Sequence, residues 1–226
     1  MLSGFASCQP IAFVFCGNFC STAAPENEKN LIAVLISGGF HDLAEIIKEK
    51  TQVQNQLAKT QFIFIPGPDD PSLSGFLPKP RLPSYLVDVF MDIPNCKFSS
   101  NPCRIQYASR EITIIRQDII ERMSRNSIHV PSDAVDIANH FCRTIASVGH
   151  LAPLPLNVSP VLWQMDHCLT IFPLPDLVVV ADRFQSFAIN QHGCLFANPG
   201  SFARSGLDFY VYYPALNEVE LSRIPS

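Results

Sequence analysis

Short uninterrupted apolar runs mark out the framework of the chain. Three of them, within residues 11–16, 61–66 and 176–181, are rich in Ile, Phe or Val. Runs of this length are typical of buried strands, because a strand covered on both faces has no solvent-facing row of polar side chains. We therefore predict that these three segments are central strands of an α/β fold.

Several segments between the predicted strands have apolar residues at helical spacing. This spacing extends over residues 30–50 and again over about 133–148, with shorter stretches at 118–124 and 161–171. The first helix lies between two strands, and the strand–helix–strand order is the usual way to join parallel neighbours. The pattern thus predicts that the first two apolar strands form a parallel pair.

Proline and β-branched residues define the remaining segments. Residues 67–83 are dense in proline, which fixes φ and cannot donate to a strand ladder, so we predict an extended loop there. A hairpin is predicted within 101–115, and further hairpin strands at 184–188, 193–197, 207–213 and 218–223. Because no repeat, low-complexity segment or linker interrupts the chain, we predict one domain over residues 1–226. Its fold class is α/β, with two packed β-sheets flanked by helices.

Charge argues against one class of function. The 226 residues contain 16 Lys and Arg against 20 Asp and Glu, with a net charge of −4 and no basic stripe. Proteins that grip DNA phosphates directly normally carry such a stripe. We therefore expect no tight direct contact between this chain and DNA. The low charged fraction of 16% favours a large core and an apolar surface for a partner.

The eight cysteines indicate a reducing compartment, the cytosol or the nucleus. None of them forms a C-x-x-C pair, and a zinc site needs ligands clustered at short spacing, so we expect buried apolar thiols instead. No apolar stretch reaches the roughly eighteen residues that a membrane span requires. The N-terminal pattern also differs from that of a signal peptide, so no membrane contact is expected.

Two glycine turns follow the first two strands and carry the candidate chemistry. Residues 17–20 read Gly-Asn-Phe-Cys and residues 67–70 read Gly-Pro-Asp-Asp. These turns resemble those of the calcineurin-like metallophosphoesterases, whose active members carry G-D-x-x-D in the first turn and G-N-H-D/E in the second. Asn18 and Cys20 therefore stand at aspartate positions, and Pro68 stands at the position of the asparagine.

The later motifs of that family are only partly retained. His150 matches an isolated histidine, and a final G-H-x-H is replaced by Ala-Asp-Arg-Phe at residues 181–184. An active two-metal site needs a full set of carboxylate, His and Asn ligands. The resemblance therefore implies a metallophosphoesterase fold without a functional metal site, with no catalytic residue and no cofactor. It places degenerate ligand positions at Asn18, Pro68, Asp69, Asp70, His150, Asp182 and Phe184.

Residual chemistry stays open as an alternative. Asp69, Asp70 and His150 have side chains that bind single ions, although an aspartate before a proline is also an ordinary turn residue. The second hypothesis is a metal-dependent phosphodiesterase or phosphatase with a degenerate site. The missing His and Asp residues favour a fold without a functional metal site over this alternative.

A longer series of blocks carries a closer resemblance. It includes Asn-Pro-Cys-Arg-Ile-Gln-Tyr at 101–107, Gly-His-Leu-Ala-Pro at 149–153, Pro-Asp-Leu-Val-Val-Val-Ala-Asp at 175–182 and Asn-Pro-Gly-Ser-Phe at 198–202. In this order the blocks resemble the B subunits of the eukaryotic replicative DNA polymerases, and among them the epsilon branch. Such subunits join an inactivated phosphoesterase-like domain to OB and N-terminal helical domains. Residues 1–226 resemble the C-terminal, phosphoesterase-like part alone.

This resemblance implies a noncatalytic accessory subunit of DNA polymerase epsilon. It would scaffold the cysteine-rich C-terminal region of the catalytic subunit during chromosomal replication in the nucleus. The implied assembly includes histone-fold small subunits and contacts the replicative helicase, so the chain would reach DNA indirectly. We expect the contact zone in the loops at 67–83 and 149–163. The sequence does not distinguish whether four aromatic residues pack in the core or anchor an interface. They are Trp163, Phe172, Phe184 and Phe187.

Overall fold

The computed structural model describes residues 8–19, 29–53, 55, 57–72, 75–129 and 134–224. These residues pack into two compact units. Unit 1 comprises Met1–Gly75 and Lys79–Asn101, and unit 2 comprises Phe76–Pro78 and Pro102–Ser226. Each unit has its own hydrophobic core, and each is described by itself. The assignment of residues 1–226 to one phosphoesterase-like domain stays a prediction.

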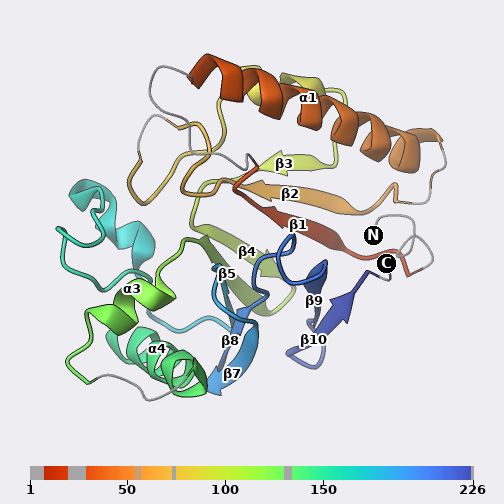
Figure 1. Ribbon diagram of the computed structural model, residues 1–226. Coiled ribbons are helices and arrows are strands. Elements are labelled where there is room, and N and C mark those ends of the chain that lie inside the picture. Colours follow the sequence, from red (N-terminus) through yellow and green to blue (C-terminus); the bar gives the residue numbers. More distant parts are fainter. Residues whose placement is uncertain are drawn as a thin grey trace. The chain divides into compact units, whose positions relative to one another are not determined.

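Unit 1 is a parallel three-stranded sheet with a helix on one face. The strands β1 (Ala12–Cys16), β2 (Gln61–Ile65) and β3 (Cys96–Phe98) lie in the order β1-β2-β3. Helix α1 (Lys29–Lys48) lies along the sheet in Figure 1. It leads into a short π-helix at Glu49–Val53, and α2 (Ser84–Val87) and a 3-10 turn (Asp88–Phe90) follow β2. The predicted strand–helix–strand unit with a parallel pair is confirmed.

A cluster of phenylalanines fills the core of unit 1. Phe40 from α1 lies against Phe64 of β2, with ring centroids 6.1 Å apart, and against Phe90, at 5.6 Å. Phe64 also stacks on Phe98 of β3 at 4.8 Å. Aromatic pairs at these separations add to the gain from burial. The alternating Phe and Ile of the second strand therefore become the centre of the unit.

One strand prediction is wrong in its placement. Among the described residues β1 pairs with β2 alone, so it is an edge strand rather than a central one. Its side chains alternate between faces, and Val14 is 40% exposed while Phe13 is buried. An apolar run shows only that a strand's own side chains are apolar. It does not show whether the strand has a neighbour on one side or on both.

Unit 2 contains a mixed five-stranded sheet in the order β4-β5-β6-β8-β7. The inner strands β5 (Arg110–Arg116), β6 (Leu177–Ala181) and β8 (Cys194–Asn198) are parallel, and the edge strands β4 (Cys103–Tyr107) and β7 (Phe187–Gln191) are antiparallel. The strand predicted at 176–181 is therefore central. Phe141 and Ile145 of α4 (Ala134–Val148) pack into the core formed with the sheet.

Three smaller elements complete unit 2. Helix α3 (Ile120–Arg125) precedes α4, and a 3-10 helix spans Trp163–Leu169. The hairpin of β9 (Asp208–Tyr213) and β10 (Glu218–Arg223) places Tyr210 and Tyr212 against Leu177 and Leu195 of the larger sheet. The predicted α/β class, with sheets flanked by helices, is confirmed. The hairpin is a third sheet beyond the two larger ones, and no helix in the described ranges is long and apolar enough to cross a membrane.

Candidate functional site at the strand-end turns

The two glycine turns of unit 1 lie against each other. Because β1 and β2 are parallel, both turns follow the carboxyl ends of neighbouring strands, and the Gly17 N–H donates to Ile65 O at 2.9 Å. A Cβ on Gly17 would lie 2.0 Å from Asp70 Oδ2, and one on Gly67 would lie 2.2 Å from Asn18 Oδ1. Neither glycine has a positive φ, so close approach is the property that requires them.

Asp70 ties the first turn to the second. Its side chain is buried, with Oδ1 accepting a hydrogen bond from the Phe19 N–H and Oδ2 accepting one from the Gly67 N–H, both at 2.7 Å. Backbone bonds to a carboxylate of this length are the strong, charge-assisted kind. A metal would have to compete with both N–H groups for these two oxygens.

Asn18 and Asp69 form a second link between the turns. The Asp69 N–H donates to Asn18 Oδ1 at 3.0 Å, and the Asn18 amide nitrogen donates to Asp69 Oδ2. The amide oxygen of Asn18, its natural metal-binding atom, is therefore used within the protein. Asn18, Pro68, Asp69 and Asp70 thus lie in the two adjacent turns, where Asn18 and Asp69 bind each other and Asp70 binds backbone N–H groups. Cys20, the remaining altered position of the first turn, lies outside the described residues.

Lys79 is the residue that the sequence analysis missed. Its side chain is 2% exposed, and Nζ lies 2.8 Å from Gly67 O, 2.7 Å from Pro68 O and 3.3 Å from Asp70 O. Burial lowers the pKa of Lys79, and the charges of Asp70 and Asp69 oppose that change. The backbone of Lys79 pairs in both directions with the buried Asn101, whose amide nitrogen donates to Pro66 O at 3.0 Å.

In unit 2, Asp182 organises the turn after β6. Its buried carboxylate accepts hydrogen bonds from the N–H groups of Ile119 at 2.7 Å, Ile120 at 2.9 Å and Phe184 at 2.8 Å. Desolvation raises the pKa of Asp182, and the three backbone donors oppose that rise. Asp182 thereby joins the β6 turn to the start of α3. Phe184, at the other ligand position, is partly buried and packs on the core of unit 2.

Two neighbours of Asp182 are also fully engaged. The buried Asn198 accepts from the N–H groups of Asp182 and Gly200 at 3.1 Å and donates to Phe184 O at 3.0 Å. Arg183 pairs with Asp118, their Nε and Oδ2 atoms being 3.1 Å apart. The positive charge of Arg183, the residue after Asp182, is thus paired with a carboxylate.

His150 has a defined structural use in unit 2. The Ala152 N–H donates to His150 Nδ1 at 3.1 Å, so a neutral imidazole carries its proton on Nε2. Nε2 lies 3.2 Å from Asp166 Oδ1 and donates to it. Both ring nitrogens therefore have partners within the protein. A metal bound to either nitrogen would displace one of them.

A dinuclear metal centre does not fit these residues. Proline supplies no side-chain donor at position 68, a phenylalanine replaces a ligand at 184, and the oxygens of Asn18 and Asp70 accept backbone bonds. In the part of the chain that the structure describes, no group of three or more His, Cys, Asp and Glu is placed to hold a metal ion. Buried side-chain nitrogens and oxygens in that part all have hydrogen-bond partners. The two glycine turns are linked by a buried carboxylate, Asp70, and by a more exposed Asn18–Asp69 pair.

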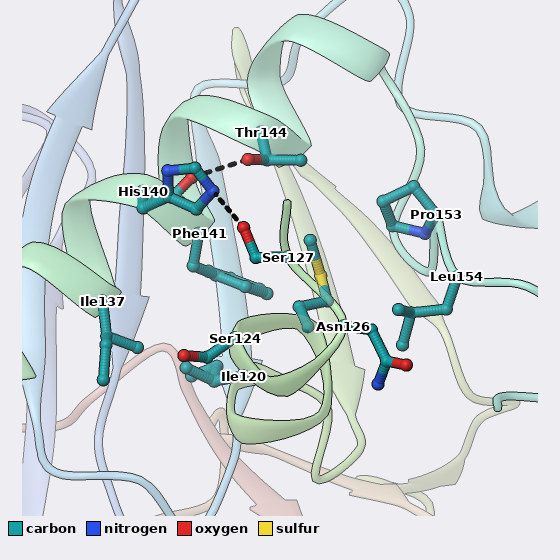
Figure 2. Close-up of a pocket in the computed structure, with 11 residues that line it drawn as sticks. Ile120, Ser124, Asn126, Ser127, Ile137, His140, Phe141, Thr144, Pro153 and Leu154 are labelled. Carbon is teal, nitrogen blue, oxygen red and sulfur yellow. Dashed lines mark hydrogen bonds between the residues drawn. The ribbon is translucent and has the colours of Figure 1, made fainter. Parts of the chain in front are cut away.

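A separate small pocket of unit 2 contains a Ser–His pair. It lies between α3, α4 and the loop at Pro153, with a volume of about 110 Å³, and Figure 2 shows Ser127 and His140 joined by a hydrogen bond in its lining. Ser127 Oγ lies 3.1 Å from His140 Nε2, but the hydroxyl donates to His129 O at 2.6 Å. His140 Nε2 must then be the donor to Ser127. The pair is oriented against removal of the serine proton, so it is not an activated nucleophile.

Comparison with known proteins identifies the family. The family model that describes the B subunit of DNA polymerase alpha/epsilon matches residues 1–189. The chain therefore belongs to this family of B subunits, and the resemblance seen in the ordered blocks is confirmed.

Curated relatives agree over almost the whole chain. DNA polymerase epsilon subunit 2 of Mus musculus is 41% identical over 225 residues, which cover 99% of this chain and 41% of the mouse protein. Probable DNA polymerase epsilon subunit 2 of Caenorhabditis elegans is 44% identical over 228 residues, covering 100% of this chain and 41% of the other. DNA polymerase epsilon subunit 2 of Drosophila melanogaster is 38% identical over 224 residues, covering 98% and 41%. The chain thus spans about two fifths of the length of these relatives.

Two solved structures share a more distant likeness. The protein TT1561 of Thermus thermophilus has a TM-score of 0.47 at 13% identity, covering 98% of this chain and 92% of the other. A novel archaeal phosphodiesterase has a TM-score of 0.44 at 10% identity, covering 99% and 88%.

Proposed function

We propose that this chain is a noncatalytic accessory subunit of DNA polymerase epsilon that scaffolds the C-terminal region of the catalytic subunit. The observation that carries the proposal is the coverage of nearly the entire chain by proteins named DNA polymerase epsilon subunit 2. The family match over residues 1–189 supports the same conclusion. The activity resides in the partner, and this chain contributes a folded surface.

The condition of the ligand positions supports a role without catalysis. Asp70, Asn18 and His150 each use their metal-binding atoms in hydrogen bonds to the protein's own backbone or side chains. An enzyme of the two-metal type needs such oxygens and nitrogens free to hold ions and activate water. Here they stabilise turns, which is what a scaffold requires of them.

The proposed partner is the cysteine-rich C-terminal region of the catalytic subunit. Histone-fold small subunits and the replicative helicase belong to the wider assembly that we propose, which acts in the nucleus and brings the chain to DNA indirectly. The acidic balance of the chain, 16 basic against 20 acidic residues, is consistent with protein rather than DNA as its direct partner.

Aromatic exposure indicates which residues of the proposed contact zone face solvent. Trp163, at the end of the 149–163 loop, is 74% exposed, and Phe76 in the 67–83 loop is 47% exposed. Phe172 is also exposed, whereas Phe184 and Phe187 pack on the core of unit 2. The four aromatics considered together in the sequence therefore divide into two exposed and two core residues. Exposed aromatics are the side chains that most often anchor an interface.

Copurification tests this function directly. The 226-residue chain, and a longer form with the remaining family regions, would be coexpressed with the cysteine-rich region of the catalytic subunit of DNA polymerase epsilon. We expect a stoichiometric complex that survives gel filtration. If neither form binds that region, the proposed function is wrong.

A second assay separates the scaffold from the phosphoesterase alternative. Metal content and turnover of a generic phosphodiester substrate would be measured for the purified chain and for Asp69→Ala and His150→Ala. We expect no turnover in any of the three proteins. Stoichiometric manganese or zinc, with turnover that both substitutions abolish, would establish the enzyme instead.

A further inference from the structure

A cradle of backbone carbonyls surrounds the end of the Lys79 side chain. The carbonyl oxygens of Gly67, Pro68 and Asp70 all point at Nζ, and the side chain is buried. An ammonium group has three donors and no acceptor, so the three oxygens match its three N–H bonds. The carboxylates of Asp70 and Asp69 are close enough to act on its charge. This is an arrangement built around a cation.

The dimensions of the cradle indicate the kind of cation. The distances from Nζ to the oxygens are 2.7, 2.8 and 3.3 Å. They exceed the roughly 2.3–2.6 Å of calcium–oxygen bonds and the roughly 2.0–2.1 Å of magnesium–oxygen bonds. Converging backbone carbonyls are the ligands that replace the hydration shell of potassium in proteins. The cradle therefore suits ammonium or potassium better than a small divalent ion.

We propose that the turn Gly67–Asp70 is a monovalent cation site whose resident cation is the chain's own Lys79 ammonium. The tethered charge fixes three carbonyls of a turn whose fourth residue, Asp70, binds the neighbouring Phe19 N–H. Lys79 thus holds the link between the two strand-end turns without an ion from solution. This role concerns the fold of unit 1 and is independent of the proposed polymerase function.

Removal of the Lys79 ammonium group should leave a site that an ammonium or potassium ion from solution can occupy. In Lys79→Ala the carbonyls keep their places but lose their donor, and the space of the side chain is opened. We expect the unfolding midpoint to fall by about 5–10 °C, because a buried charged partner is lost in a chain of this size. Ammonium or potassium chloride should restore at least half of that loss. Tetramethylammonium chloride at the same ionic strength should restore none, since its methyl groups do not fit or donate.

Two variants serve as matched controls. Lys79→Met fills the space with an apolar chain, so it should lose a similar stability without rescue by any cation. Lys97→Met removes an exposed lysine of β3 in the same unit and should leave the midpoint within about 1 °C. Wild type in the same salts reports the general effect of ions.

Several outcomes would overturn the proposal. Lys79→Met as stable as wild type would show that the charge is not needed. An equal response of wild type, Lys79→Ala and Lys79→Met to ammonium and tetramethylammonium would show that no cation site exists. If Lys79→Ala does not fold in tetramethylammonium, the yield of soluble folded protein in each salt becomes the measurement. Equal yields would contradict the proposal, and a higher yield in ammonium or potassium would support it.

Discussion

At the scale of single residues, the contact between the strand-end turns depends on two glycines as much as on the polar side chains that link the turns. Gly17 and Gly67 allow Asp70 and Asn18 to reach the opposite turn. The sequence marks these glycines only as turn residues. Their distances to Asp70 and Asn18 show that contact between the two turns, and not φ, excludes a larger residue.

Gly17→Ala should therefore destabilise the protein. The new Cβ would lie 2.0 Å from Asp70 Oδ2 and 2.6 Å from the Gly67 backbone nitrogen, so a hydrogen-bonded turn must move. We expect a loss of about 2–4 kcal/mol from strain and weakened charge-assisted bonds. Chemical denaturation would measure it. Gly38→Ala is the control, because a Cβ added there in helix α1 would meet nothing within 4 Å beyond its chain neighbours and the adjacent helix backbone. It should gain about 0.5–1 kcal/mol. Equal effects of the two changes would contradict this account.

Asp176 gives unit 2 a pH dependence whose sign is defined. The Glu111 N–H and the Arg110 guanidinium lower the pKa of Asp176 by stabilising its charged form. A lowered pKa adds stability that is complete above the ordinary Asp value of about 4 and is lost as pH falls below it. Asp176→Asn should be less stable than wild type at pH 7, and the difference in midpoint should shrink below about pH 4. A difference that is constant from neutral to acid pH would contradict this cause.

At the scale of elements, one carboxylate connects two parts of unit 2. Asp182 follows β6 and accepts the N–H groups of Ile119 and Ile120, where α3 begins. Asp182→Ala should leave these donors and the Phe184 N–H without an acceptor, which we expect to cost about 3 kcal/mol or more. Hydrogen exchange at Ile119 and Ile120 should accelerate together with the loss of stability. Glu121→Ala, which removes only an exposed pair with Arg125, should cost less than about 0.5 kcal/mol.

The sequence predicted elements better than it predicted their neighbours. Most predicted helices and strands are present, because periodicity and apolar runs are local signals. β3 was missed because its three residues include the exposed Lys97, too few for a period of two. The edge position of β1 was missed because strand order depends on distant parts of the chain. The sequence of one strand does not specify which other strands pair with it.

The sequence indicates where the two glycine turns lie, but not what their side chains bind. The residues of the two turns were found because each follows a strand and carries glycine. Lys79 had only a weak signal, a lone lysine between two prolines, since its carbonyl partners lie nine or more residues away. The buried Asn101 and Asn198 both precede a proline, which marks a turn but does not say what the amide binds.

At the scale of the whole molecule, composition and structure lead to the same kind of function. The chain has few charges, polar side chains of its two glycine turns bond within the protein, and its family is that of polymerase B subunits. The function proposed above requires a stable surface from this chain. Large exposed apolar side chains, and not the altered motifs, are then the residues whose change should affect the proposed assembly.

Trp163 is the exposed side chain whose replacement best tests whether the proposed contact zone binds the catalytic subunit. Its ring is 74% exposed in the proposed contact zone, so Trp163→Ala should leave the unfolding midpoint nearly unchanged. If the ring anchors the catalytic subunit's C-terminal region, its loss should weaken binding by about 2 kcal/mol, or roughly 30-fold in Kd. Tyr85→Ala is the matched control, because Tyr85 is an exposed aromatic, 59% accessible, that lies outside both proposed loops. Isothermal titration with both variants would measure the difference. Unchanged affinity for Trp163→Ala, or equal losses for the two variants, would mean that the contact zone lies elsewhere on the chain.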